Sequence, residues 1–558
     1  MSDHSSLSQR RHDLDALRAF AMLLGIALHS AMSFTGFGWI VQDTRTSFTY
    51  VFFMLLIHGF RMQLFMMVSG YFTMMVYRRR GLKSLLKQRF SRVFLPCLLG
   101  LVTVVPAMDL ASVWASGMNR GGNGQNVQKG TQPQDYREAI ASRNIEAVRE
   151  MIAAGKDLNL PDERFRLFPL AWACLYGDIE MTRLLIDSGA DVKAVSADRN
   201  TVVHHASFMG YPEILRLVID RGADSFAKNN DGSTGIDSAF VPMETTSYIA
   251  KLIEVPLREN GELLSGRVQC IKLLEKLGVR AKSEASESAN LLGRIRGQYA
   301  DFLGSERFKT SLTRHGQPFH LILTSFFHHL WFLWFLCWFV IFFAIGAIIF
   351  SRFLCDHFAA LITTSRYRLP VLVCISMLPQ LFMGSIKPSF GPDTSTGIIP
   401  EPHLLAYYFI FFGFGAIYYD HQDLAPSLGR KWKRIFPFAI LLLFPAGLVT
   451  MNRPVIGGMV QLFYTWSMVF AITGCFESCI KEESRPLRYL SDSAYWLYLV
   501  HLPLVVIFQG VVKNWPVPSL IKLIMICIAV TFFGLVSYEY LVRDRWIGRL
   551  LNGPSKKS

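Results

Sequence analysis

The first apolar stretch of the chain, residues 11–34, carries the ionisable residues Asp15, Arg18 and His29. Arg18 and His29 lie eleven positions apart, and at about 100° per residue a helix brings both side chains to one face. At about 1.5 Å of rise per residue, roughly 16 Å separates them along the helix axis. Asp15 lies one turn before Arg18. Because ionisable side chains inside a membrane usually face a protein interior or a wet cavity, this helix is expected to form one wall of a polar passage.

These residue types suit acid–base chemistry. A neutral imidazole accepts a proton from a hydroxyl group near neutral pH, and a guanidinium binds phosphate through two hydrogen bonds. Each residue alone also has a simpler interpretation, because Arg18 can extend to lipid headgroups and His29 can be a buried structural group. The shared face, with Asp15 one turn behind Arg18, favours a functional site made of His29, Arg18 and Asp15 over these separate interpretations.

The composition indicates an integral membrane protein with a soluble part. Of the 558 residues, 51% are hydrophobic and 44 are Phe, and the mean hydropathy is +0.30. The net charge of +15 comes from Lys and Arg residues that lie between apolar runs, as the positive-inside rule expects, so no nucleic acid partner is expected. The nine Cys residues lack paired spacing and support neither a zinc site nor a disulfide framework.

Apolar runs long enough to span a bilayer recur along the chain. About ten are expected, near residues 15–35, 50–76, 93–114, 322–350, 369–386, 403–419, 435–451, 455–476, 494–512 and 519–542. Basic clusters at alternate connections place both chain ends in the cytoplasm. The expected fold is therefore an all-α, polytopic helix bundle in the inner (plasma) membrane, in two parts at residues 1–118 and 315–558.

A polar insert at residues 131–282 separates the two parts. Leu170–Gly177 recurs 33 positions later as Val203–Gly210, and the Gly-Ala-Asp triplet at Gly189 recurs at Gly222. The period and the spaced Ala and Gly positions resemble ankyrin repeats, in which stacked helix pairs share one core. A degenerate first repeat is expected at Ala139–Gly155, a third from Thr234 and a cap at Cys270–Arg280.

Repeat arrays of this kind commonly bind a partner through a concave surface, and a spacer or stabilising lid is the alternative. His204 and His205 lie where ankyrin repeats commonly place a polar residue at a helix start, so they are interpreted as structural and not as metal ligands. The direction of the third span puts the insert outside the cytoplasm, which is unusual for such repeats. The Gly- and Asn-rich residues 119–130 before it have the composition of a linker.

Five motifs in chain order resemble the acyltransferase-3 family of polytopic membrane acyltransferases. They are the Arg18-to-His29 spacing, Phe60–Phe72 with its Ser-Gly-Tyr, Arg89-x-x-Arg92, His329–Trp334 and Ser491–Pro503. The last two are similar to the branch of the family that modifies periplasmic glucans. The resemblance covers most of the chain outside the insert, which departs from the usual family pattern. It implies an O-acyltransferase that moves an acetyl or succinyl group from cytoplasmic acyl-CoA to a hydroxyl of an extracytoplasmic glycan.

The resemblance and the residue chemistry together suggest roles at the inner end of the passage. His29 is expected to act either as general base or as carrier of the acyl group, and Arg18 to contact the donor or orient its path. Arg89 and Arg92, three positions apart on one helix face, suit the phosphates of acyl-CoA. Ordinary positive-inside charges are the alternative for this pair.

At the outer end, His329 and Trp331 are expected at the mouth of the fourth span. There Trp331 either stacks on an acceptor sugar or belongs to the interfacial aromatic belt, while His501 shapes the cavity. No metal is expected, because no metal-binding pattern, phosphate-binding Gly loop or nucleophile elbow is found.

Acyl-CoA, membrane lipid, the glycan acceptor and a protein that binds the repeats are therefore the expected partners. Two other classes of protein remain as alternatives to the acyltransferase. One is a non-catalytic glycan carrier or exporter that uses the same passage. The other is a membrane-anchored binding protein that works through its ankyrin-like insert.

Overall fold

The computed structural model describes residues 11–36, 39–123, 135–162, 164–241, 246, 249–250, 253–257, 260–281, 291–314, 317–349, 356–384, 390–422, 428–451, 453–482 and 484–552. Close contacts divide the chain into a membrane unit, residues 1–122 and 296–558, and a repeat unit, residues 123–295. The expected domain limits at residues 131, 282 and 315 lie outside the described residues, as does the linker stretch 124–130. Residues 119–123 are the end of a helix.

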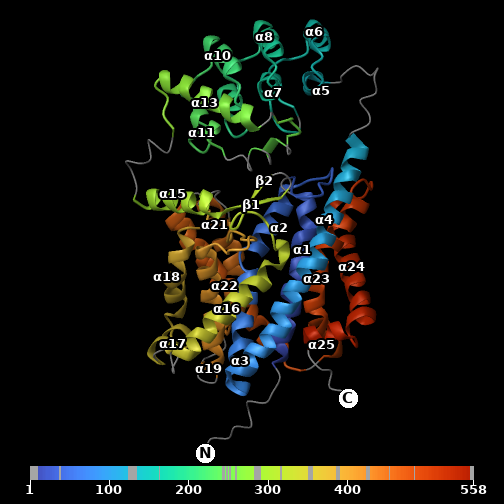
Figure 1. Ribbon diagram of the computed structural model, residues 1–558, viewed down its shortest axis with the longest axis vertical. Coiled ribbons are helices and arrows are strands. Elements are labelled where there is room, and N and C mark those ends of the chain that lie inside the picture. The colour runs from blue at the N-terminus through green and yellow to red at the C-terminus, as the bar shows by residue number, and fades with distance from the viewer. Residues whose placement is uncertain are drawn as a thin grey trace, which may run out of the picture. The chain divides into compact units, whose positions relative to one another are not determined.

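The membrane unit is almost entirely helical in its described part (Figure 1). Its first half contains α1 (His12–Ala31), η2 (Met32–Phe34), α2 (Phe48–His58), α3 (Arg61–Arg89), η3 (Phe90–Phe94) and α4 (Leu95–Asn123). Its second half contains α15 (Leu291–Leu303), η4 (Glu306–Phe308), η5 (His328–Leu330), α16 (Trp331–Ile349), α17 (Asp356–Thr363), α18 (Arg368–Gln380), α19 (Pro402–His421), α20 (Trp432–Phe438), η6 (Ala439–Leu443), α21 (Phe444–Thr450), α22 (Pro454–Cys479), α23 (Arg485–Val512), α24 (Ser519–Ser537), η7 (Tyr538–Val542) and α25 (Trp546–Asn552). The described strands are β1 (Lys309–Arg314) and β2 (Gln317–His320), an antiparallel pair. The predicted all-α class is confirmed.

Seven segments of the described chain have the length and hydropathy of a membrane span, or eight if one bent helix pair is counted. The 68-residue segment Phe48–Ala115 contains two of the ten predicted runs. The bent pair, His357–Thr363 and Arg368–Gln380, turns by 103°, and the predicted run 369–386 falls on its second helix. The remaining run, α19, is less apolar because it carries four Tyr residues, and it is largely buried among other helices. Each predicted run therefore contains a helix, although fewer than ten qualify as spans by themselves.

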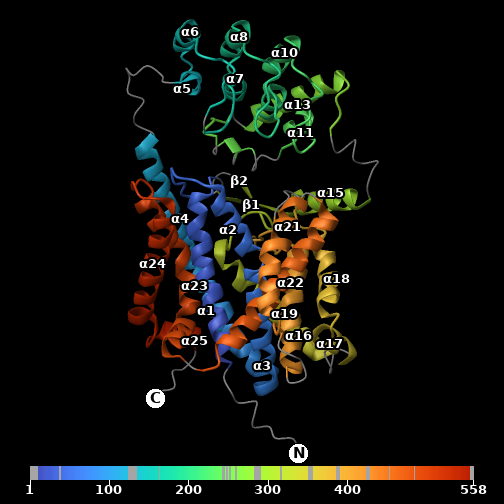
Figure 2. The same cartoon turned by 180° about the vertical axis from the view of Figure 1, so that it is seen from behind.

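The chain reverses direction near the end of α3. Gly81 has φ 74° and ψ 171°, a backbone conformation that glycine adopts without steric cost. In Figures 1 and 2, the lower part of α3 lies at the same end of the membrane unit as the start of α1 and α25. This end is called the basic end, because the basic residues between Arg78 and Arg92 surround the turn. The opposite end, with β1, β2 and α15, is called the hairpin end.

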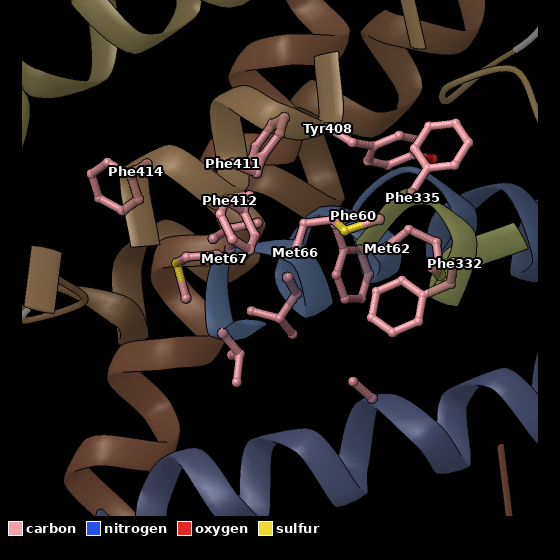
Figure 3. Close-up of a cluster of buried hydrophobic side chains, with 14 of the residues drawn as sticks. Phe60, Met62, Met66, Met67, Phe332, Phe335, Tyr408, Phe411, Phe412 and Phe414 are labelled. Carbon is pink, nitrogen blue, oxygen red and sulfur yellow. The ribbon is translucent and has the colours of Figure 1, made fainter. Parts of the chain in front are cut away.

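The core of the membrane unit lies between α3, α16 and α19. Aromatic and Met side chains from these helices interdigitate in Figure 3: Phe60, Met62, Met66, Met67, Phe332, Phe335, Tyr408, Phe411, Phe412 and Phe414. Two glycines let α3 and α19 approach closely. A Cβ added at Gly70 would overlap the carbonyl of Phe412, and one added at Gly415 would overlap the carbonyl of Met67. Small residues at such interfaces allow helix backbones to touch inside membranes.

Replacing Gly70 by alanine is expected to destabilise the membrane unit by about 3 kcal/mol, at the upper end of overpacking costs, because a backbone carbonyl has no room to move away. The free energy of unfolding in detergent, measured for Gly70→Ala against wild type, tests this. Gly413→Ala is the matched control on α19, since a Cβ there meets nothing within 4 Å. Equal stability of the two variants would contradict the close helix contact.

The repeat unit stacks helix pairs as the sequence predicts. Its described helices are α5 (Tyr136–Ala141), α6 (Ile145–Ala153), α7 (Pro169–Tyr176), α8 (Ile179–Asp187), α9 (Val202–Phe208), α10 (Pro212–Asp220), α11 (Gly235–Ala239) and α13 (Asn260–Lys276). They share one core. Gly177 and Gly210, 33 positions apart, have φ of 72° and 65° at equivalent turns. The degenerate first repeat is the pair α5 and α6, and the expected cap begins within α13.

His204 is structural, as predicted. Its Nδ1 accepts a hydrogen bond from the backbone N–H of Thr201 at 3.2 Å, and its Nε2 donates to the carbonyl of Ser233 at 2.9 Å. The ring therefore caps α9 and ties it to the next repeat. Burial lowers the pKa of the neighbouring His205 to about 3. Across the described residues, no group of three His, Cys, Asp or Glu side chains is arranged to hold a metal ion.

Candidate active site

A cavity of about 1120 Å³ follows α1 through the membrane unit. Arg11, before α1, lines it at the basic end, and Trp39, after η2, lines it near the hairpin end. The structure brings all the site residues expected from the sequence to this one cavity: Asp15, Arg18, His29, Arg89, Arg92, His329, Trp331 and His501. Within the described residues, the polar face of α1 therefore lines a cavity, as the sequence predicts.

Three histidines from distant parts of the chain meet in the cavity. The ring centroids of His29 and His501 are 5.4 Å apart, and those of His329 and His501 are 5.3 Å apart. Nδ1 of His501 lies 2.8 Å from the carbonyl of Tyr498, and Nε2 of His329 lies 3.0 Å from the carbonyl of Leu499. Because a carbonyl only accepts, both nitrogens donate. When neutral, each ring therefore keeps its other nitrogen as an acceptor.

Each of the three rings has one buried nitrogen without a hydrogen-bond partner among the described residues: Nδ1 of His29, Nδ1 of His329 and Nε2 of His501. The His29 ring stacks on Trp39 at a centroid distance of 5.8 Å and an interplanar angle of 21°. Nε1 of Trp39 donates to Gln509 at 2.7 Å, and the Gln509 amide donates to the backbone carbonyl of His29 at 2.9 Å. The side chain of Gln509 on α23 thus holds both the end of α1 and the ring that covers His29.

His329 in η5 and Trp331, the first residue of α16, lie at the start of the fourth predicted run, where both form part of the cavity wall. His329 is 8% exposed and contacts His501, and Trp331 is 9% exposed and packs on Tyr408. The reason is that η5 and the start of α16 are enclosed by α3, α19 and α23, so this end of the fourth span faces protein. The Trp331 side chain therefore faces protein, unlike the residues of an interfacial aromatic belt.

Guanidinium groups gather at the basic end of the cavity. Arg18 donates to the backbone carbonyl and the hydroxyl of Ser491 at 3.1 and 3.0 Å, and it lies 3.8 Å from Asp15. Arg89, the last residue of α3, donates to the hydroxyl of Thr73 at 2.9 Å. Arg18 and Arg92 both lie within electrostatic range of Arg89. The pair expected from Arg-x-x-Arg therefore joins Arg18 to form a positive cluster that suits a polyphosphate.

Arg61, which the sequence did not single out as a site residue, also lines the cavity. The second predicted run, residues 50–76, is two helices, α2 and α3, that are interrupted at Gly59 and Phe60, and Arg61 opens α3 directly after the break. A signal was available, because an Arg within an apolar run is a functional candidate by the same rule that selected Arg18. His58, at the end of α2, was missed for the same reason.

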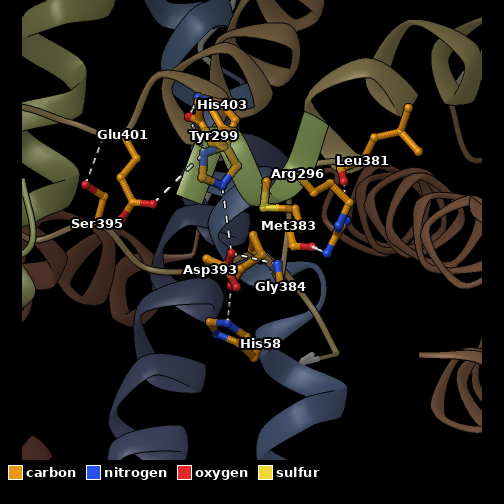
Figure 4. A network of polar contacts seen from close by, with 11 residues as sticks. His58, Arg296, Tyr299, Leu381, Met383, Gly384, Asp393, Ser395, Glu401 and His403 are labelled. Atoms are coloured by element: carbon orange, nitrogen blue, oxygen red, sulfur yellow. Dashed lines mark hydrogen bonds and ion pairs between the residues drawn. The ribbon is translucent and has the colours of Figure 1, made fainter. Parts of the chain in front are cut away.

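A polar network lies at the hairpin end of the membrane unit (Figure 4). Tyr299 of α15 hydrogen-bonds to Nδ1 of His403 at 2.9 Å, and Nε2 of His403 lies 3.8 Å from Asp393. Arg296 of α15 donates to the backbone carbonyls of Leu381 and Met383. The segment 390–401 between these groups also lines the cavity through Thr394 and Thr396. Helix α15 is thereby fastened to the cavity wall.

Glu401 in this network is expected to make stability depend on pH. Burial, and then the nearby Asp393, raise the pKa of Glu401 from 4.5 to about 7. The folded protein therefore holds this proton at pH values where the unfolded chain has lost it, so stability falls as pH rises from 4.5 to about 7. Glu401→Gln cannot ionise and is expected to be more stable than wild type at pH 8 by roughly 2–3 kcal/mol, with little difference at pH 4.5.

Melting temperatures of Glu401→Gln and wild type at the two pH values test this expectation. Glu482→Gln, at an exposed carboxyl of the same unit, is the control. An increase in melting temperature of equal size at both pH values would contradict the raised pKa of Glu401.

Comparison with known proteins finds a family match for each of the two units. A family model described as an acyltransferase domain matches residues 11–134 and 287–539, and a model of three ankyrin repeats matches residues 137–229. The insert therefore interrupts the acyltransferase match. A crystal structure of the ankyrin repeat domain of Bcl-3 matches 21% of this chain and 50% of that chain, with 24% identity and a TM-score of 0.18.

Curated relatives include glucans biosynthesis protein C of Shigella dysenteriae serotype 1 (strain Sd197), 40% identical over 103 residues, and of Escherichia coli (strain K12 / DH10B), 39% identical over 103 residues. The match covers 18% of this chain and 26% of each relative, so the chain spans about a quarter of the length of these proteins. The family match, in contrast, extends over both parts of the membrane unit. The chain belongs to the acyltransferase-3 family.

Proposed function

We propose that this protein is a membrane O-acyltransferase that moves an acyl group from cytoplasmic acyl-CoA to a hydroxyl group of an extracytoplasmic glucan. The observation that carries the proposal is the one cavity that holds a cluster of arginines at the basic end and a cluster of histidines toward the hairpin end. Glucan as the acceptor class is supported by the relatives named for glucan biosynthesis. Acetyl and succinyl groups are both compatible with the proposal.

Arg18, Arg89 and Arg92 would bind the phosphates of the donor. Guanidinium groups form two parallel hydrogen bonds with phosphate oxygens, and these three are supplied by α1, α3 and η3. The thioester then extends along α1 toward His29. Asp15, 3.8 Å from Arg18, orients that guanidinium and limits the local positive charge.

His29 would act on the acceptor hydroxyl. As general base, the imidazole takes the hydroxyl proton while the hydroxyl oxygen attacks the thioester carbon, and the proton then passes to the departing CoA thiolate. As acyl carrier, the imidazole attacks first and the hydroxyl takes the acyl group in a second step. Trp331, His329 and His501 are proposed to bind the acceptor sugar, since all three line the cavity and the His501 ring contacts the rings of both His29 and His329.

The proposed orientation puts the basic end in the cytoplasm. It is supported by the basic residues around the Gly81 turn and by the positive-inside rule. Both chain ends would then be cytoplasmic and the repeat unit extracytoplasmic, in the inner membrane. The repeat unit is proposed to gather the acceptor or to bind a protein partner.

Purified protein in lipid vesicles, supplied with acyl-CoA and glucan, tests the function through free CoA and the mass of the glucan. The proposal predicts CoA release together with a mass increase of one acyl group. A carrier or exporter would move glucan without releasing CoA. Deletion of residues 131–282 provides a second comparison, because a protein that works only through its repeats would lose all function, whereas the acyltransferase keeps residual acylation.

A further inference from the structure

Arg61 places a positive charge in the middle of the cavity without a matching carboxylate. Within the part of the chain that the structure describes, no ion pair includes Arg61, no partner reaches its Nε, and its Nη2 contacts the Met62 sulfur at 3.5 Å. The side chain is enclosed by protein and faces the cavity. An enclosed charge without a partner costs several kcal/mol, so a group of this kind suits a site where negative charge arrives or develops.

Gly25 on α1 makes room for this charge. A Cβ added at Gly25 would overlap Nη1 of Arg61, so the guanidinium occupies the space that any other residue would fill. Gly25 lies on the face shared by Arg18 and His29, seven positions after Arg18 and four before His29. At about 1.5 Å per residue these intervals are roughly 10 Å and 6 Å along the axis. The charge of Arg61 therefore lies about one helical turn from His29.

The position of Arg61 separates it from the arginines at the basic end. Those side chains lie where donor phosphates would enter, whereas His29, His58 and His501 lie within electrostatic range of Arg61. The thioester carbonyl is neutral before reaction and gains a full negative charge on oxygen as the carbon becomes tetrahedral. A fixed cation at that place stabilises the transition state more than the bound substrate.

We propose that Arg61 is a catalytic residue that stabilises the oxyanion formed from the thioester carbonyl, and that Gly25 is a positioning residue that seats its guanidinium. This role of Arg61 depends on the proposed acyltransferase function. When the attacking atom bonds to the thioester carbon, the carbonyl electron pair moves to oxygen beside Arg61. The electron pair on the oxyanion then re-forms the carbonyl as the carbon–sulfur bond breaks. CoA leaves as thiolate, which takes up the proton of the acceptor hydroxyl. The same charge arises whether His29 is base or carrier.

Steady-state kinetics of Arg61→Met, Arg61→Lys and Gly25→Ala, with acetyl-CoA and with succinyl-CoA, test the proposal. Arg61→Met is expected to lower kcat about 10²-fold, the typical loss for one oxyanion-stabilising group, with KM for either donor changed less than threefold. Arg61→Lys is expected to recover part of the rate because it restores the charge. Gly413→Ala, where a Cβ meets open space, is the control for adding a methyl group to a helical glycine.

Gly25→Ala tests the geometry without removing the charge. It is expected to lower kcat about tenfold, and to have no further effect when combined with Arg61→Met, because the displaced group is then absent. Binding of CoA to each variant, measured by calorimetry, verifies that the site still folds.

Three results would overturn the proposal: an unchanged kcat in Arg61→Met, a loss confined to succinyl-CoA, which would make Arg61 an anchor for the free carboxylate, or an undiminished Gly25→Ala effect in the Arg61→Met background. Failure of wild type to release CoA would instead overturn the proposed function.

Discussion

Replacing His29 by alanine is expected to lower kcat for acyl transfer about 10³-fold or more, within the range for loss of a general base. The ring lines the cavity, and no described residue already uses its Nδ1 as a hydrogen-bond partner. CoA binding should remain, since the arginines at the basic end are untouched. CoA release by the purified variant, with CoA affinity measured in parallel, provides the test.

His421→Ala is the matched control for this substitution. Its Nδ1 donates to the carbonyl of Ile417, one turn earlier on α19, and it does not line the cavity. Its kcat should equal that of wild type. Mass spectrometry of acid-quenched protein also distinguishes the two routes, because an acyl group on the peptide that contains His29 indicates a carrier. Full activity in His29→Ala would exclude His29 both as general base and as acyl carrier.

Replacing Arg89 and Arg92 together by alanine is expected to raise KM for acyl-CoA about 10³-fold. A hydrogen bond to a charged group contributes about 1.5–3 kcal/mol, so two guanidinium groups contribute roughly 3–6 kcal/mol, or about 10²- to 10⁴-fold in affinity. The effect on kcat should be small, because both residues line the cavity at the basic end, away from His29. Initial rates over a range of acyl-CoA concentrations measure both constants.

Lys87→Ala controls for loss of charge in the same segment. Lys87 is exposed, lies two positions before Arg89 and does not line the cavity. Lys87→Ala should leave KM for acyl-CoA unchanged. If the double variant also kept the wild-type KM, the Arg-x-x-Arg pair would serve only as a positive-inside signal.

The parts of the site that follow one helix could be predicted from the sequence. A constant rotation per residue puts Arg18, Gly25 and His29 on one stripe, and the structure puts all three beside the cavity or a group that lines it. The repeats could also be predicted from the sequence, because each ankyrin unit packs on its neighbour 33 positions away and carries its own turn signals.

The convergence of separate helices could not be predicted in this way. His329 and His501 approach each other across more than 170 positions, and no local pattern specifies which helix faces pack together. The same limit hid the central place of α19, since burial against α3 and α18 compensates for its tyrosines. Arg61 was missed because the run around it reads as one span, whereas the break at Gly59 and Phe60 turns its side chain into the cavity.

The central claim is that one cavity joins a donor on one side of the membrane to an acceptor on the other. The most direct measurement traps glucan inside sealed lipid vesicles that contain the protein and adds acyl-CoA only outside. Acylated glucan should accumulate in the vesicle interior with wild type and not with His29→Ala. Acylation that occurs only when donor and glucan are supplied on the same side would contradict transfer through the cavity.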